Sequence, residues 1–366
     1  MTKIKIIGKF YDNHSLAIIN RYLAINMHNK LSGDISIQPL DAPSCENKVS
    51  ASTIKTLKSI ENNEAADIEI RHSYPIMWNW PENKNTKVVY IQPWEFMAIP
   101  SEWQYKFDTF ADLVITPSEW TANVYKSAGI NPDKIRVIPN GYEPSIFYPK
   151  NTRTKKTFLF VGCSQFRKGL DILLTAWSKS TNKKDEVQLI VKDTPQIYGK
   201  TNLQQEIIQL QYKTKCANIV YDDSVKSEAE MSSLYNSAHY IVHPYRGEGF
   251  GMHIQEAMAC GAIPIITSGG PTDEFASSAI KINTGKRIVN MYDIFALKPG
   301  DSMSHMGQHK WVLEPDVTHL VELIKTAIKS EYKNTEVQLP NTWDIIADKY
   351  IETLTTINSE KPERVR

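Results

Sequence analysis

The sequence lacks the cysteine pattern of a disulfide framework or a zinc site. Its four cysteines, Cys45, Cys163, Cys216 and Cys260, are scattered over 366 residues and form no C-x-x-C pair. It also lacks an excess of either charge, since 42 basic and 41 acidic side chains leave a formal charge of +1. Such a chain has no global field that would collect nucleic acid or an anionic membrane. These absences favour a globular protein in a reducing compartment.

Long apolar runs are absent as well. No run approaches the ~18 residues that a membrane-spanning helix requires. The opening MTKIKIIGKF breaks at Gly8 and has too short an apolar stretch for a signal peptide, so it is more typical of a first strand. We therefore expect a soluble, unprocessed, cytoplasmic protein, with peripheral contact with a membrane left open.

Short β-branched runs alternate with longer stretches of helical spacing. The run Ile4–Ile7 precedes apolar residues spaced i, i+3, i+7 between Leu16 and Met27, the pattern of a helix that packs on a core. Ser118 is the expected N-cap of another helix, which Gly129 ends. Further strand runs are Ile35–Leu40, Ile68–Ile70, Val88–Ile91, Leu113–Thr116 and Ile135–Ile138. Alternating strands and helices predict a parallel sheet.

The alternation stops over residues 140–157 and then restarts. We interpret this stretch as an interdomain linker, and expect its basic residues Lys150, Arg153, Lys155 and Lys156 to be solvated. After it, TFLFVG, VQLIVKD, NIVYDD, YIVHPY and AIPIIT predict a second set of strands. The sequence thus predicts two doubly wound α/β halves, followed by a packed helix between residues 341 and 357.

One strand-to-helix turn of the second half carries two adjacent cations. In FVGCSQFRKGLDILLTAW a strand ends at Gly162 and a helix begins near Gly169, which places Arg167 and Lys168 beside a helix N-terminus. Backbone N–H groups and the helix dipole favour an anion there, so two cations suit a diphosphate. The spacing does not match a Walker motif. A solvated Arg-Lys turn is the alternative.

A second turn, in HPYRGEGFGMHIQEAMACGAIPIITSGGPTDE, is rich in glycine. Residue 252 is Met, so the dinucleotide pattern G-x-G-x-x-G fails, which argues against a nicotinamide dehydrogenase. Glu248 in the turn and Glu256 on the following helix can accept hydrogen bonds from two sets of hydroxyls, while N–H groups between them bind phosphate oxygens. A sugar, a diphosphate and a ribose in a row would satisfy this arrangement.

With these motifs the sequence resembles the retaining glycosyltransferases of glycosyltransferase family 4 (group 1), which have the GT-B fold of two Rossmann-like domains facing across a cleft. The matching segments are VIPNGYEPSIFYP and the two turns above, the second of which holds the family's E-x7-E pattern as Glu248 and Glu256. The resemblance implies an acceptor-binding domain over residues 1–147, a donor-binding domain over residues 148–340, and a helix and tail over residues 341–366 that pack back on the first domain.

The resemblance also implies roles for individual residues. Lys168 would bind the donor diphosphate, Glu248 the sugar hydroxyls and Glu256 the nucleotide ribose. Many members have arginine where this chain has Cys163, so Arg167 is expected to supply the missing cation, and Cys163 to be a packing residue. The other expected donor-binding positions are Gly8, Gly162, Gly249, Phe250, Gly251 and Met252.

The first domain departs from the family in the loop after Val88–Ile91, which reads QPWEF where many members have a histidine. It resembles a subgroup with the same loop. Glu95 is therefore expected to face the donor sugar or the acceptor and to orient the attacking hydroxyl, with a structural carboxylate as the alternative. Arg71 and His72 are expected to point at the same cleft. Four tryptophans, Trp78, Trp80, Trp94 and Trp103, suit hydrophobic packing or a wall against sugar rings.

The resemblance therefore implies a hexosyltransferase that moves a sugar from a UDP- or GDP-linked donor to an acceptor hydroxyl with retention. No D-x-D metal motif is present, so positive side chains are expected to stabilise the leaving diphosphate without a metal, and no cofactor is expected. The acceptor is left open among a glycan, a lipid-linked sugar, a protein and a modified nucleobase, as is the oligomeric state. The alternatives are a nucleotide-sugar epimerase or hydrolase of the same fold and a non-catalytic sugar-nucleotide-binding module.

Overall fold

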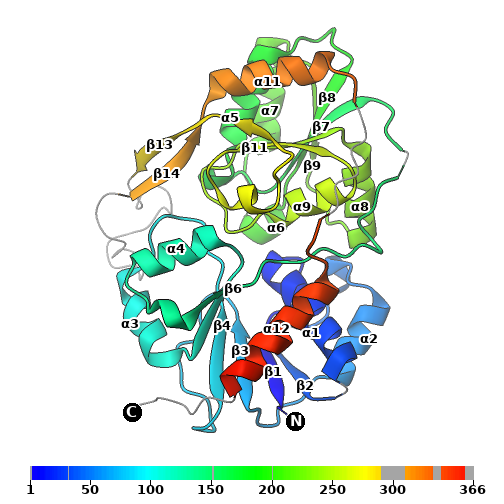
Figure 1. Cartoon of the computed structure of the whole chain (residues 1–366). Helices are drawn as coiled ribbons and strands as arrows, with labels where there is room; N and C mark the ends of the chain where they lie inside the picture. Colours follow the sequence, from blue (N-terminus) through cyan, green and yellow to red (C-terminus); the bar gives the residue numbers. More distant parts are fainter. Residues whose placement is uncertain are drawn as a thin grey trace.

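The computed structural model of the chain describes residues 2–31, 33–150, 152–199, 201–289, 310–332 and 339–358. Two α/β domains lie one above the other, and the C-terminal helix returns from the second domain to the first (Figure 1). Within these ranges no helix combines the length and the apolar character needed to cross a membrane.

The N-terminal domain is built on a parallel sheet with the strand order β2-β1-β3-β4-β5-β6. Its strands are β1 (Ile4–Gly8), β2 (Ile35–Pro39), β3 (Ile68–His72), β4 (Lys87–Ile91), β5 (Leu113–Thr116) and β6 (Ile135–Val137). Side chains alternate across a strand, so Val89 and Ile91 enter one core while Val88 and Tyr90 enter the other. The predicted strands of this half are confirmed.

Helices cover both faces of this sheet. The first face carries α1 (Ser15–Leu31), α2 (Ala51–Ser59) and α12 (Trp343–Asn358), and the second carries α3 (Ser101–Phe110) and α4 (Glu119–Ser127). As predicted, Ser118 caps α4, its side chain accepting the N–H of Thr121 at 3.1 Å. The ring of Trp343 on α12 stacks on Tyr22 of α1 with 5.4 Å between centroids. Residues 359–366 of the expected tail lie outside the described residues.

The C-terminal domain repeats the design with the strand order β12-β11-β10-β7-β8-β9. Its strands are β7 (Lys156–Val161), β8 (Val187–Lys192), β9 (Asn218–Asp222), β10 (Tyr240–His243), β11 (Ile263–Thr267) and β12 (Ile280–Ile282). Its helices are α5 (Leu170–Ser180), α6 (Pro195–Tyr198), α7 (Leu203–Thr214), α8 (Glu228–Ser237), α9 (Met252–Ala259) and α11 (Val317–Lys329). Two cores again form, one under α5, α7 and α11 and the other under α8 and α9. The prediction of two doubly wound halves is therefore confirmed.

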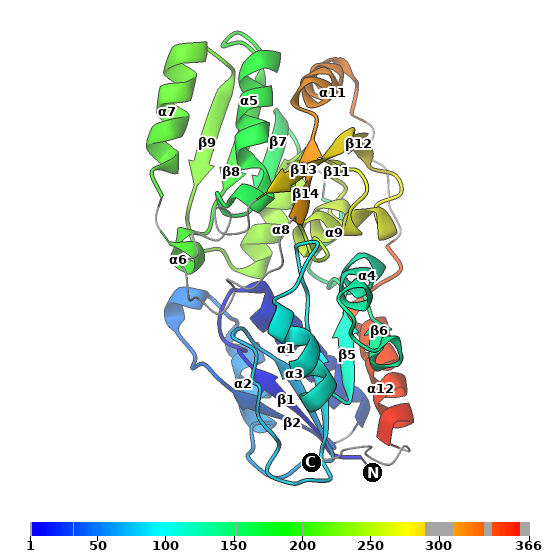
Figure 2. The same cartoon turned by 90° about the vertical axis from the view of Figure 1, so that its left-hand side faces the viewer.

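An antiparallel hairpin, which the sequence patterns did not predict, extends from the second domain. Its strands are β13 (Thr284–Val289) and β14 (Lys310–Pro315). It reaches toward α4 of the first domain (Figures 1 and 2). Val312 of β14 is buried in the core that contains Trp94, Trp103 and Phe107. The hairpin therefore joins the hydrophobic core of the other domain.

The linker corrects one expectation, because two of its basic side chains are half-buried and bind backbone carbonyls of the second domain. Arg153 donates to the carbonyls of Ala238 and Cys260, both at 2.7 Å. Lys156 donates to carbonyls at the end of α11, including that of Ile328 at 2.7 Å. Carbonyl groups at a helix C-terminus attract a cation because they lack intrahelical donors. These two side chains thus anchor the linker to the second domain.

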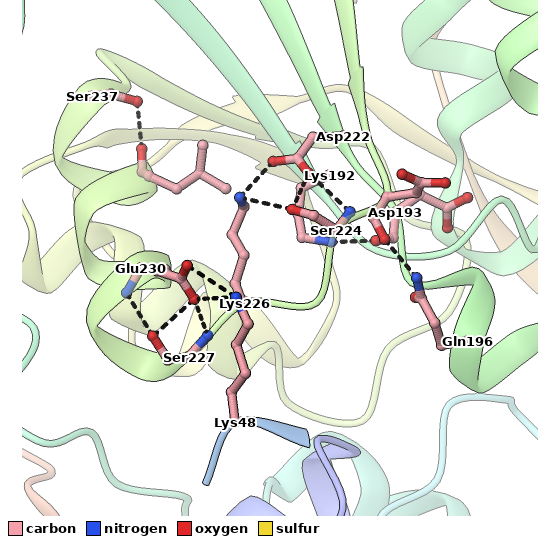
Figure 3. A network of polar contacts seen from close by, with 12 residues as sticks. Lys48, Lys192, Asp193, Gln196, Asp222, Ser224, Lys226, Ser227, Glu230 and Ser237 are labelled. Atoms are coloured by element: carbon pink, nitrogen blue, oxygen red, sulfur yellow. Dashed lines mark hydrogen bonds and ion pairs between the residues drawn. The ribbon is translucent and has the colours of Figure 1, made fainter. Parts of the chain in front are cut away.

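Polar contacts also join the domains beside the linker. Lys48, which precedes α2, pairs with Glu230 of α8 at 2.9 Å (Figure 3). Glu230 belongs to a capping box with Ser227 at the start of α8, so the same carboxylate serves the helix and the interface. On α1, Tyr22 donates to Glu228 at 2.7 Å. The two domains are therefore held close together on this side.

Candidate active site

A cavity of about 510 Å³ lies between the two domains. The first domain lines it with the loops after β1, β3 and β4, and the second with the loops after β7 and β8 and the turn before α9. All are carboxyl ends of parallel strands, where ligands of open α/β sheets bind. A wider depression of about 1680 Å³ lies at the opposite end of the first sheet and is lined by none of the candidate catalytic or donor-binding residues. The interdomain cavity is therefore the candidate active site.

The four residues that the sequence predicts to be catalytic come together in this cavity. Lys168 Nζ lies 2.5 Å from Glu248 Oε2, and Arg167 Nη1 lies 3.8 Å from the same oxygen. Arg167 Nη2 reaches across the domain boundary to Glu95 Oε1 at 3.3 Å. Lys168 and Glu248 are each 8% exposed. The site thus holds two cations and two carboxylates, largely shielded from water.

Two glycines allow the backbone segments around this cluster to come close to one another. Gly169, between the short turn η3 (Phe166–Lys168) and α5, has φ +70, and a β-carbon there would overlap the carbonyl of Pro244. A β-carbon on Gly247 would lie 2.3 Å from the carbonyl oxygen of Glu95 in the other domain. Any larger residue would push these segments apart. The glycines therefore set both the placement of Lys168 and the closeness of the two domains.

The Glu248 carboxylate is ionised in spite of its burial. Burial alone would raise its pKa, but the charge of Lys168, the neighbouring His243 ring and the charge of Arg167 together hold the pKa well below its usual range. A carboxylate that stays charged accepts hydrogen bonds from hydroxyl groups and does not act as a proton donor.

The predicted donor-binding positions fall into two groups. Gly162, Gly249, Phe250, Gly251 and Met252 line the cavity. Among the residues that the structure describes, no side chain caps the start of α9 or of α5, so the first N–H groups of both helices can face an anion. Cys163, which replaces the family arginine, is a buried residue on the same wall.

Gly8 and Glu256 do not line the cavity. A β-carbon on Gly8 would lie 2.4 Å from the carbonyl oxygen of His72, so this glycine permits close packing of β1 and β3. Glu256 accepts a hydrogen bond from Tyr235 at 2.9 Å, and burial raises its pKa to about 8. Contact of either residue with a donor stays a prediction.

Arg71 does not point at the cleft, so that expectation is wrong. Its guanidinium donates to Glu69 at 2.6 Å and to carbonyls of the following loop, while His72 lines the cavity. Neighbouring residues of a strand face opposite ways, so both could not reach the cleft. Of the four tryptophans, Trp94 lines the cavity, and Trp78 and Trp103 pack in the core of the second face. Packing is therefore their main role, with Trp94 at the cavity wall.

The sequence patterns missed two histidines beside Glu248. His243, at the end of β10, is fully buried, and within the described part of the chain neither of its ring nitrogens has a hydrogen-bond partner. His253, on the first turn of α9, has a buried, unpartnered Nε2, and the two rings lie 4.3 Å apart between centroids. The signal was present as H-x4-E-x4-H, with Glu248 at its centre.

Comparison with known families agrees with this geometry. The model described as Glycosyltransferase Family 4 matches residues 71–146, and that of Glycosyl transferases group 1 matches residues 145–285. A probable sucrose-phosphate synthase of Thermosipho melanesiensis is 30% identical over 38% of this chain and 34% of that protein. The MMP alpha-(1->4)-mannosyltransferase of Mycolicibacterium hassiacum is 27% identical over 43% of this chain and 36% of that protein. The matched segment thus spans about a third of the length of these relatives.

Solved structures with this fold cover almost the whole chain. Anabaena Alr3699/HepE in complex with UDP and glucose aligns over 97% of this chain and 100% of its own, with a TM-score of 0.66 and 15% identity. WaaG, a glycosyltransferase involved in lipopolysaccharide biosynthesis, aligns over 96% of this chain and 95% of its own, with a TM-score of 0.57 and 14% identity. At these identities the likeness concerns the fold, and it confirms the expected GT-B arrangement.

Proposed function

Because the chain belongs to the group 1 glycosyltransferases of family 4, we propose that it transfers a sugar from a nucleoside-diphosphate sugar to an acceptor hydroxyl, with retention and without a metal. The C-terminal domain, residues 148–340, binds the donor and the N-terminal domain, residues 1–147, binds the acceptor. Structures of Alr3699/HepE hold UDP or UDP-glucose. A relative from Xanthomonas oryzae is named for GDP-mannose. A UDP- or GDP-linked donor is therefore proposed here.

The observation that carries this proposal is the ion pair between Lys168 and Glu248 in the interdomain cavity. A buried pair of this kind can exchange partners when a ligand offers both charges. The donor diphosphate would take the ammonium of Lys168, and the released carboxylate of Glu248 would accept hydrogen bonds from the sugar hydroxyls. Each group then loses one charged or polar partner and gains another, so the buried charges stay satisfied.

The same groups explain how transfer would be accelerated. The bond between the anomeric carbon and the phosphate oxygen breaks, and its electron pair goes to the diphosphate. Lys168, Arg167 and the N–H groups at the start of α9 face the charge that develops there, so they stabilise the transition state more than the ground state. The acceptor oxygen bonds to the anomeric carbon on the face that the phosphate leaves, and its proton passes to a phosphate oxygen. No protein nucleophile takes part.

Glu95 would serve the acceptor side of this reaction. It stands on the QPWEF loop of the first domain and pairs with Arg167 of the second at 3.3 Å. We propose that it orients the attacking hydroxyl while its pairing with Arg167 keeps the domains closed. Closure excludes water, which would otherwise hydrolyse the donor.

The proposal is tested by incubating the protein with UDP-, GDP-, ADP- and TDP-sugars and candidate acceptors. Transfer predicts consumption of one donor, with its sugar appearing on a second molecule. A hydrolase would release free sugar, and an epimerase would return an altered donor. A binding module would raise its melting temperature with the nucleotide sugar yet leave it intact. Any of these three outcomes would overturn the assignment.

A further inference from the structure

Three side chains from one strand-turn-helix segment converge beside the Lys168 ammonium. His243 ends β10, Glu248 lies in the glycine-rich turn, and His253 is on the first turn of α9. One ligand atom from each of them lies within 4.8 Å of the others. The even spacing H-x4-E-x4-H places them on a single short segment that the sheet and helix hold rigidly.

Three histidine nitrogens in this cluster lack hydrogen-bond partners among the described residues. They are both nitrogens of His243, which is fully buried, and Nε2 of His253. Buried polar atoms normally have a partner, so an unpartnered one that faces a carboxylate calls for an explanation. An imidazole binds a metal through an unprotonated ring nitrogen, so these nitrogens are candidate ligands.

We propose that His243, Glu248 and His253 form a binding site for a divalent transition metal, with Zn²⁺ as the best fit. Two imidazoles and one carboxylate suit zinc, whereas Mg²⁺ and Ca²⁺ prefer oxygen ligands. The three ligand atoms, which lie within 4.8 Å of one another, must move closer by roughly 1 Å, because ligands about 2.0–2.2 Å from a tetrahedral zinc stand about 3.3–3.6 Å apart. The absence of cysteine pairs, which argued against zinc, does not bear on such a site.

Lys168 competes with the metal for Glu248. Its Nζ lies 2.5 Å from Glu248 Oε2, and that oxygen lies 3.5 Å from His243 Nε2. A zinc ion bonded to the same oxygen at about 2.0–2.2 Å would occupy the position that the ammonium now takes. Metal binding therefore requires Lys168 to swing toward the open cavity. The competition predicts that removal of the lysine charge tightens the binding of metal.

The metal would inhibit and would have no part in transfer. This consequence rests on the proposed function, in which Glu248 accepts the sugar hydroxyls. A Glu248 carboxylate that coordinates an ion cannot also accept hydrogen bonds from the donor sugar, so Zn²⁺ should compete with the donor. The binding site itself does not depend on that function and can be measured on the protein alone.

The experiment titrates Co²⁺ and then Zn²⁺ into the full chain after removal of any affinity tag. Visible absorption of cobalt reports its ligands, and calorimetry gives the dissociation constant. His253→Gln should weaken binding by at least about tenfold, since even outer partners of metal ligands are worth about 10–100-fold. Lys168→Met should tighten it. The matched control is His28→Gln, because His28 also has an unpartnered Nδ1 but belongs to no such cluster among the described residues.

Three results would overturn the site: no binding of either metal, equal binding by wild type and His253→Gln, or Lys168→Met binding no more tightly than wild type. If His253→Gln does not fold, Lys168→Met still decides, because it keeps all three ligands. Failure of the proposed function would look different, since a protein that transfers no sugar could still bind the metal with this order of affinities.

Discussion

The backbone of Gly247 lies against the carbonyl oxygen of Glu95 across the domain boundary, with room for no side chain between them. The turn also carries Glu248, and Arg167 of η3 pairs with Glu95 and donates to the carbonyl of Gly247 at 3.4 Å. The closeness of the two domains at the cavity is thus set by one glycine, and a change at that position tests the geometry directly.

Gly247→Ala should open the cavity without unfolding the protein. The new β-carbon would lie 2.3 Å from the oxygen of Glu95, so the turn and the QPWEF loop must separate. A displacement of about 1 Å can cost about 100-fold in rate, so we expect a loss of that order in kcat. Steady-state kinetics would measure the loss in kcat, and small-angle scattering would measure any wider separation of the two domains. The control is Gly285→Ala, whose β-carbon would meet nothing within 4 Å; equal activity of the two variants would contradict the prediction.

Lys168→Ala and Glu248→Ala should each abolish most transfer while the fold remains intact. Loss of one group that stabilises developing charge typically costs roughly 100 to 1,000-fold in turnover. Because the two side chains contact each other at 2.5 Å, the double variant should lose much less than the product of the single losses. Turnover with the identified donor measures both effects. Lys155→Ala, an exposed lysine of the linker, is the control. Wild-type rates in either single variant would remove that residue from the site.

Arg246→Lys should weaken the protein and misplace the turn that carries Lys168. The guanidinium of Arg246 binds both oxygens of Asp171 at 2.8 and 2.7 Å and donates to the carbonyl of Phe166 at 2.9 Å. Lysine lacks the planar fork that makes the bidentate contact. We expect the free energy of unfolding to fall by about 1.5–3 kcal/mol, which is the range for hydrogen bonds to charged groups. We also expect the KM for the donor to rise.

Denaturant unfolding and donor kinetics check this prediction together. Arg246 also pairs with Glu314 at 2.8 Å. The matched control is Arg287→Lys, since Arg287 is 53% exposed and pairs with the same Glu314 at 3.7 Å. A normal KM in Arg246→Lys, with only its stability reduced, would show that Arg246 does not position the donor site.

Local patterns predicted most of the fold because each strand is an apolar run between turn residues. The hairpin β13–β14 was missed because Gly285, Lys286, Arg287 and Ile288 of β13 are exposed and carry no alternating apolar signal. Arg71 was misplaced because the choice of face depends on the strand register, which the sequence alone does not fix here. Contacts between domains, such as Arg167 with Glu95, join positions 72 residues apart (167 − 95) and leave no local pattern.

The part of the candidate site that the sequence predicted consists of charged residues that stand next to glycines. Arg167, Lys168 and Glu248 all stand in glycine-bearing turns at strand ends, where backbone approach and ligand binding require the same residue. The sequence patterns did not predict His243 and His253 as site residues, because a histidine in an apolar segment is usually a packing residue. Their unpartnered nitrogens become visible only when the strand, turn and helix are assembled.

Glu256 should make the stability of the protein depend on pH. Burial raises its pKa from 4.5 to about 8; the hydrogen bond from Tyr235 opposes this rise, and the charge of Glu228 adds to it. Between those two pH values the unfolded chain releases a proton that the folded chain keeps. The folded state therefore loses stability as pH rises from about 4.5 to about 8, by at most about 1.4 kcal/mol per pH unit, and the loss stops above the folded pKa.

Glu256→Gln mimics the protonated form and should remove this dependence. The variant and the wild type should be similarly stable near pH 4.5, and the variant should be the more stable of the two at pH 8. Denaturant unfolding at several pH values between these limits measures the difference. The exposed Glu322→Gln provides the matched control, since it should leave the wild-type dependence unchanged. Parallel curves for wild type and Glu256→Gln would mean that Glu256 is ionised in the folded protein at neutral pH, and a ribose would then meet a charged carboxylate there.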